Sequence, residues 1–274
     1  MFELPVETPR LSALSEADLR AEIRRRVRAY PIASDPAEIV ARALDYPYTT
    51  PDSSYVLVGE QPVPLDQHPL VEEGRCPVLA YGSNGSPEAL LRKFARDDAE
   101  AERLVLPVLV GELEDFDVVY SSHFSAYGPL PATLHHTPGV RVKACITLLT
   151  SEQVVRMVET EFHYSLRHLR GLRFASPDYS CSEVVAFVSR HGALGIGGSP
   201  VPLAAISASG RRPATSLSQR DALESARRWL GADEELDDFI LANVRDAERS
   251  LAHTEALKRD RIEFDYEDAV ILDR

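Results

Sequence analysis

Hydrophobic residues near the N-terminus follow a helical spacing. Apolar positions recur every fourth residue over 19–27, which places them on one face of a helix, and a second short helical pattern covers 35–44. Six prolines then interrupt residues 46–77, so we expect an extended arm there, with one short strand at 55–58. These features predict a helical N-terminal extension and connecting arm over residues 1–75.

From Cys76 onward the chain consists of short apolar runs separated by turn residues such as Asn84-Gly85. Helical patterns interrupt these runs after Ser86-Pro87 and after Thr150-Ser151. Closely spaced strands favour antiparallel pairing, and a small barrel hides their edges, so residues 76–208 are expected to form one. The predicted strands cover residues 78–81, 105–111, 116–121, 132–134, 140–149, 183–189 and 201–206.

The last part of the chain returns to a helical spacing. Apolar stripes continue from Gly210 to about Arg261, and a strand-like segment follows at 267–272. Residues 209–274 are therefore expected to form C-terminal helices packed on the barrel. The predicted fold class is α+β, with a small antiparallel β-barrel and N- and C-terminal helical extensions.

Composition and charge narrow the range of partners. The 274 residues include 43 acidic side chains against 30 Lys and Arg, a formal net charge of −13. Binding to a phosphate backbone requires clustered cations, so no nucleic acid partner is expected. The N-terminus lacks the basic and apolar regions of a signal peptide, and no apolar run reaches the ~20 residues of a membrane span, which predicts a cytoplasmic protein without a membrane partner. The three cysteines form no Cys-x-x-Cys step and are expected to be buried free thiols.

The segment from Pro77 to Pro87 is the best candidate for a binding site. A short apolar strand leads into the turn Tyr81-Gly82-Ser83-Asn84, and the turn leads into a helix. Main-chain N–H groups at such a turn can converge on a carboxylate or on a developing oxyanion. The alternative is a plain strand-to-helix connection that needs glycine for its backbone angles.

The Tyr-Gly-Ser-Asn turn after a short strand is similar to the signature of the gamma-glutamylcyclotransferase-like superfamily, whose members fold as a small β-barrel with flanking helices. Four later segments resemble further blocks of that family in the same order. The resemblance covers residues 76–208, about half of the chain. The matching segments are 116–121, 125–128 with 131–134, 138–149 and the helix over 151–161.

The resemblance implies intramolecular aminolysis, in which the α-amine of a γ-glutamyl group attacks its own γ-carbonyl and releases 5-oxoproline and an amine. It implies a small-molecule substrate with an amine and a carboxylate, no cofactor and no metal. Aligned with the family helix, Glu161 is the general base and acid. The turn residues Tyr81, Gly82, Ser83 and Asn84 position the substrate, and Tyr127 and Tyr164 close the pocket. The sequence specifies no oligomeric state.

The chain departs from the family pattern around this carboxylate. Val158 replaces an aspartate and Phe162 replaces a glycine, which permits a second reading of the barrel as a non-catalytic module for small-ligand binding or interaction. Glu159 competes for the role of base, because two residues on a helix point about 200° apart and only one can face the pocket. His163, four residues after Glu159, also allows a metal pair, although a second His of the zincin type is missing.

Overall fold

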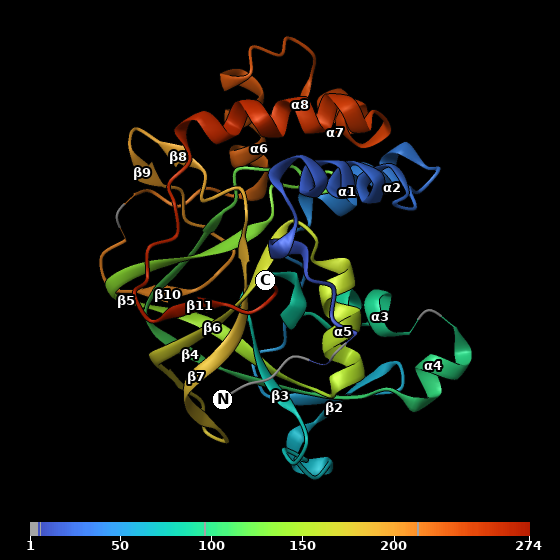
Figure 1. Ribbon diagram of the computed structural model, residues 1–274, viewed down its shortest axis with the longest axis vertical. Helices are drawn as coiled ribbons and strands as arrows, with labels where there is room; N and C mark the ends of the chain where they lie inside the picture. Colours follow the sequence, from blue (N-terminus) through green and yellow to red (C-terminus); the bar gives the residue numbers. More distant parts are fainter. Residues whose placement is uncertain (1–4, 6, 96, 213) are drawn as a thin grey trace.

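Five strands close into a barrel in the computed structural model, which describes the whole chain except residues 1–4, 6, 96 and 213 (Figure 1). Pairings run in a ring from β4 to β5, β3, β7, β6 and back to β4, and only the β3–β7 pair among them is parallel. Because the barrel is closed, each of the five strands has a hydrogen-bonded neighbour on both sides. The predicted α+β barrel is therefore confirmed. The barrel strands are β3 (Cys76–Ala80), β4 (Val105–Tyr120), β5 (Ala132–Leu149), β6 (Tyr164–Ala175) and β7 (Ser180–Ser189).

Short strands extend the barrel wall. β1 pairs with β4, β10 with β5 and β11 with β6, while β2 continues the sheet from β1. β8 and β9 form a separate hairpin, whose turn residues Gly197 and Gly198 have φ of 60° and 79°, angles that glycine adopts without strain. The bounds are β1 (Tyr55–Val58), β2 (Gln61–Pro64), β8 (Gly195–Ile196), β9 (Ser199–Pro200), β10 (Ala208–Ser209) and β11 (Ala269–Ile271).

Helices from both ends of the chain form a layer over one end of the barrel (Figure 1). α1 (Glu16–Arg28) packs on α8 (Ala247–Leu257), and α2 (Pro36–Leu44) packs on α7 (Leu236–Arg245), beside α6 (Gln219–Trp229). α3 (Pro87–Phe94), α4 (Asp98–Arg103) and α5 (Ser151–Thr160) lie beside the barrel, and short 3-10 helices cover 11–13, 65–67, 83–85 and 258–260. None of the helices in the described residues is long and apolar enough to cross a membrane.

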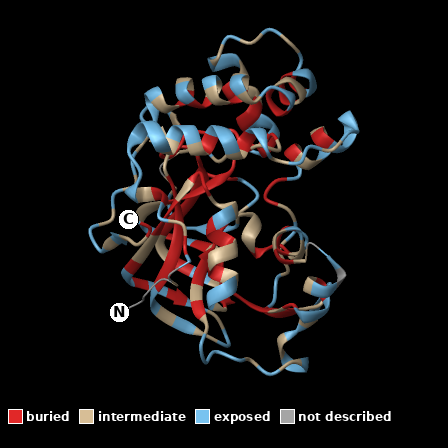
Figure 2. Ribbon diagram, turned by 45° about the vertical axis from the view of Figure 1, so that its right-hand side comes forward, coloured by how far each residue is buried: buried red, intermediate tan, exposed pale blue. Residues whose placement is uncertain are grey.

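Buried residues concentrate in the strands, and the outer faces of the helices carry exposed residues (Figure 2). One apolar cluster fills the barrel and continues to α2, α6 and α7. A second lies between the barrel wall and the helices α3 and α5, where Leu90, Val154 and Met157 are almost fully buried. A third, smaller cluster joins Ile23 and Val27 of α1 to Phe162.

Three expectations about the strands were wrong. The separate predicted strands over 105–121 and over 132–149 are two long strands, with a register shift at Asp115, where φ is 62°. β6 was not expected, and residues 201–206 form isolated bridges rather than a strand. Leu166 belongs to the cluster beside α3 and α5 and Leu169 to the barrel interior, so both faces of this part of β6 are apolar. The register shifts after Arg170, and Leu172 also belongs to the barrel interior.

Candidate functional site

A cavity of about 710 Å³ opens between the barrel and the helical layer. Its walls come from the turn after β3, the segment from α5 to β6, residues 123–132, and the N-terminal helices α1 and α2. The structure therefore brings together every residue that the sequence placed at the site. These residues are Tyr81, Gly82, Ser83, Asn84, Tyr127, Glu161 and Tyr164.

The turn after β3 leaves main-chain donors open. Its internal hydrogen bonds use the N–H groups of Gly85 and Ser86, at 3.3 and 2.9 Å. The N–H groups of Gly82, Ser83 and Asn84 donate to no acceptor in the described part of the protein. Pro87 occupies the first position of α3 as expected, but the Ser86 side chain makes no capping hydrogen bond. An anion in the cavity would find these three free amides at the turn.

Position 82 requires glycine because neighbouring side chains lie very close to its Cα. A Cβ at this position would lie 2.6 Å from the Tyr46 hydroxyl oxygen and 3.1 Å from the Ala132 Cβ. The same Tyr46 oxygen accepts the N–H of Ala132 at 2.7 Å, so it is fixed in place. The turn therefore packs on the barrel at Gly82, with no room for a side chain.

Glu161 reaches the turn from the other side of the cavity. The carboxylate atom Oε1 accepts a hydrogen bond from Asn84 Nδ2 at 3.0 Å and pairs with the Lys93 ammonium. The side chain is only 12% exposed, and Oε2 has no partner within the described residues. By contrast, the Glu159 side chain is 46% exposed and pairs with Arg156 at 3.2 Å. Of the two competing carboxylates, Glu161 is the one beside Asn84.

The helix geometry expected for these two glutamates was wrong. α5 begins at Ser151, where Thr150 is the N-cap and forms a capping box with Gln153, and ends at Thr160. Glu161 is the C-cap residue, with φ of −101° and ψ of 38°, so its direction does not follow the helical period. Its carboxylate is positioned by the turn into β6.

The tyrosines form the walls of the cavity mainly with their rings. The Tyr81 hydroxyl donates to the carbonyl of Phe187, and the Tyr164 hydroxyl donates to that of Ala132 at 2.9 Å. Burial raises the pKa of Tyr127 and Tyr164, and neighbouring tyrosines and the Glu161 charge add to the shift. The phenols are therefore protonated at neutral pH.

Sequence reasoning missed the cation beside Glu161. Lys93 is on α3 three residues after Leu90, on a face where the pattern indicated apolar packing, and its side chain is 16% exposed. It also missed that Tyr30, Arg42, Tyr46 and Tyr48 from the N-terminal part line the same cavity. A lysine on the inner face of an amphipathic helix was the one signal that the sequence offered.

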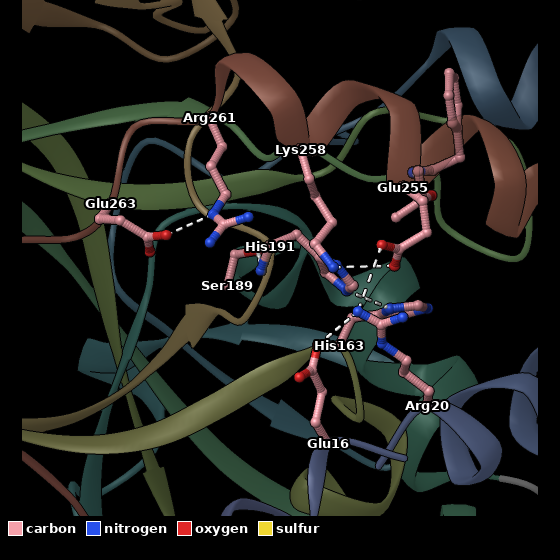
Figure 3. Close-up of polar contacts among 11 residues, drawn as sticks. Glu16, Arg20, His163, Ser189, His191, Glu255, Lys258, Arg261 and Glu263 are labelled. Carbon is pink, nitrogen blue, oxygen red and sulfur yellow. Dashed lines mark hydrogen bonds and ion pairs between the residues drawn. The ribbon is translucent and has the colours of Figure 1, made fainter. Parts of the chain in front are cut away.

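Three buried histidines adjoin the cavity. The His163 and His191 rings point toward each other, with Nδ1 and Nε2 2.9 Å apart (Figure 3). The His123 ring centre lies 4.5 Å from that of His163 and 4.6 Å from that of His191. Burial lowers the pKa of all three, to about 3 for His163. The cluster is therefore neutral at neutral pH.

Neither a catalytic triad nor the Glu159–His163 metal pair is formed. Ser121 Oγ lies 2.7 Å from His123 Nδ1, but its other close partner is the Ser189 hydroxyl at 2.6 Å, so no carboxylate orients the pair. His163 contacts His191, whereas Glu159 pairs with Arg156. Across the described ranges, no group of three or more His, Cys, Asp or Glu side chains is arranged to hold a metal ion.

These features define a class of protein with a closed barrel and a cavity where free main-chain amides face a carboxylate. No family model and no curated protein matches the chain. A solved structure titled "Gamma-glutamyl cyclotransferase" matches with 15% sequence identity and a TM-score of 0.32. That match covers 42% of this chain and 66% of the other, just under two thirds of its length, and it is a distant likeness of fold only.

Proposed function

We propose that the protein is a cofactor-free, cyclotransferase-like enzyme that cleaves a γ-glutamyl-type amide by intramolecular amine attack, giving 5-oxoproline and a free amine. One observation carries this proposal. The Glu161 carboxylate is held at Oε1 by Asn84 and Lys93, and its second oxygen is left for a ligand in a cavity with three free main-chain amides. A base and a set of oxyanion donors are what this reaction requires.

Each step can be assigned to a group in the cavity. Glu161 Oε2 takes a proton from the substrate α-ammonium, and the freed nitrogen attacks the γ-carbonyl carbon. The N–H groups of Gly82, Ser83 and Asn84 hold the carboxylate of the substrate or the oxygen on which negative charge develops. Glu161 then gives the proton to the leaving nitrogen as the old C–N bond breaks and the carbonyl reforms. It next takes the second proton from the ring nitrogen and passes it to the released amine, so 5-oxoproline leaves with one N–H, the amine leaves as an ammonium, and Glu161 is again ionised. The bond to the released amine is replaced by the ring bond, and no bond to the protein forms.

Asn84 and Lys93 act on this chemistry by positioning the carboxylate. Both contact Oε1, so together they fix the plane of the carboxylate and direct Oε2 away from themselves. Tyrosine rings line the cavity beside the carboxylate. A substrate nitrogen would therefore meet a base whose orientation is already set.

A non-catalytic ligand-binding module is the second candidate, and the Lys93–Glu161 pair favours it. An ammonium that already satisfies the carboxylate makes the side chain a structural element of a binding pocket. In that case the free amides of the turn bind an anionic ligand without any reaction.

The Glu161→Gln variant separates the two candidates. Glutamine keeps the size of the side chain and an oxygen for Asn84 but accepts no proton at the position of Oε2. Against a panel of γ-glutamyl amides, 5-oxoproline release should fall by about 10²–10⁴-fold, the usual contribution of a general base. Glu152→Gln is the matched control and should keep its activity, because Glu152 lies in the exposed first turn of α5 and does not line the cavity. Unchanged turnover in Glu161→Gln contradicts the role of this residue, and ligand binding without 5-oxoproline from any amide supports the binding module.

A further inference from the structure

Arg42 places a guanidinium at the cavity wall without a carboxylate to balance it. Six basic side chains line the cavity. Arg42 is the one that has no carboxylate within 4 Å anywhere in the described part of the chain. The other five pair with nearby glutamates and are Arg25, Arg26, Arg92, Lys93 and Arg156.

Two tyrosines hold this guanidinium in place. Arg42 Nη2 donates to the Tyr30 hydroxyl at 2.7 Å, and the guanidinium carbon lies 4.7 Å from the ring centre of Tyr127. The Tyr48 side chain also interacts with the guanidinium, and the buried Nε has no hydrogen-bond partner. Tyrosines therefore fix the group in position, and within the described residues it makes no hydrogen bond to a carboxylate.

A partly buried charge without a counter-ion is costly, and the ligand is a natural source for one. A guanidinium is planar and its paired N–H groups match the two oxygens of a carboxylate. The Tyr30 and Tyr127 rings, 5.9 Å apart, provide flat apolar surface beside it. Since the chain as a whole carries a net charge of −13, attraction of an anion to this point depends on the local cation.

We propose that Arg42, with Tyr30 and Tyr127, forms an anion subsite for a carboxylate carried on an aromatic part of the ligand. Arg42 and Tyr30 of the subsite belong to the N-terminal extension and Tyr127 to the connection between β4 and β5, and the Glu161 carboxylate is more than 4 Å from Arg42. As a statement about the substrate it rests on the proposed function: the released amine would be an aryl amine bearing a carboxylate. As a binding site it does not depend on catalysis.

Binding to the full-length protein tests the subsite directly. Calorimetry with 4-acetamidobenzoate and with neutral acetanilide should show that the carboxylate probe binds about tenfold to hundredfold more tightly, as expected for a charge-assisted hydrogen-bonded pair. Arg42→Met should abolish this preference, and Arg42→Lys should keep part of it because it retains the charge. Arg24→Met is the control, since Arg24 pairs with Glu248 on the outside of α1 and does not line the cavity.

These measurements distinguish an anion subsite at Arg42 from a purely structural role of this residue. Loss of packing would weaken both probes together and lower the melting temperature, whereas loss of the subsite weakens the carboxylate probe alone. Failure of the carboxylate probe to bind, equal affinity for the two probes, or an unchanged preference in Arg42→Met overturns the proposal.

Turnover separates the subsite from the reaction. With γ-glutamyl-4-carboxyanilide and γ-glutamylanilide as substrates, Arg42→Met should lower the ratio of kcat/KM for the first substrate to kcat/KM for the second about tenfold or more. If the binding preference is found and neither anilide yields 5-oxoproline, the subsite stands and the proposed reaction fails for this substrate class. If both anilides are cleaved equally well by the wild type and by Arg42→Met, the reaction stands and the subsite is refuted.

Discussion

Lowering the pH from 7 to 5 should destabilise the protein through its buried histidines, and the share of His163 can be worked out. Its side chain is buried, and burial together with the Arg190 charge lowers its pKa from 6.5 to about 3. In the unfolded chain the imidazole titrates near its ordinary value. The unfolded state therefore binds the proton more tightly, so stability is fully present above about pH 6.5 and is lost as the pH falls toward 3.

The magnitude follows from these two values. Between pH 7 and pH 5 the unfolded chain gains most of a proton at this position and the folded chain gains almost none, which costs about 2 kcal/mol for His163 alone. His123 and His191 are also buried with lowered pKa values and contribute in the same direction. Such a loss is a large fraction of the ~5–15 kcal/mol that stabilises a typical domain.

The assay is urea unfolding of wild type and of His163→Asn at the two pH values. The loss of unfolding free energy on going to pH 5 should be smaller in the variant by about 2 kcal/mol. His68→Asn is the control, because His68 is half-exposed and lies outside the three-histidine cluster. NMR titration of wild type checks the cause, since the His163 resonances should keep their neutral positions down to about pH 4. An identical pH-dependent loss in wild type and His163→Asn would refute the reasoning.

Two further substitutions test the packing around the site and the join between the chain ends. Gly82→Ala should cost about 1–3 kcal/mol of unfolding free energy, because the new Cβ would clash with the Tyr46 hydroxyl. In urea unfolding, adding Tyr46→Phe to the Gly82→Ala variant should recover part of this loss. If the losses of the two substitutions are strictly additive, the contact is contradicted. Asp273→Ala should lower the unfolding free energy by about 3 kcal/mol. The reason is that Asp273 is almost fully buried, pairs with Arg190 and accepts a hydrogen bond from the Leu166 N–H at 3.1 Å. A melting temperature within a degree of wild type would show that this pair contributes little.

Local patterns predicted those elements whose spacing is regular. α1 and α2 form where the spacing predicted helices, capped by Ser15 and Asp35, and Pro87 begins α3. β6 escaped prediction because Leu166 and Leu169 are buried on opposite faces of the strand and the register shifts after Arg170, so apolar and polar residues do not alternate in the way that identifies a strand. The merging of two predicted strands into β4 has a similar cause, since the irregularity at Asp115 divides one strand into two separate apolar runs.

Only the parts of the candidate site that rest on a short motif or on the family resemblance could be predicted from the sequence. The turn at Gly82 and the carboxylate of Glu161 follow from these, and the structure places both at one cavity. Lys93 and Arg42 did not follow, because their importance depends on which residues from distant segments lie beside them. The direction of Glu161 was also beyond the sequence, since it depends on α5 ending one residue earlier.

Phe162, where the family resemblance expects a glycine, has a clear structural partner. Its ring packs against Ile23 and Val27 of α1, and the Arg26 guanidinium lies 5.7 Å from the ring centre. Phe162, the residue that follows Glu161, thus anchors α1, a helix outside the barrel. Substitutions in α1 can therefore change which molecules enter the cavity without changing the folding of the barrel. Differences in ligand preference among related proteins would be sought first in the N-terminal helices.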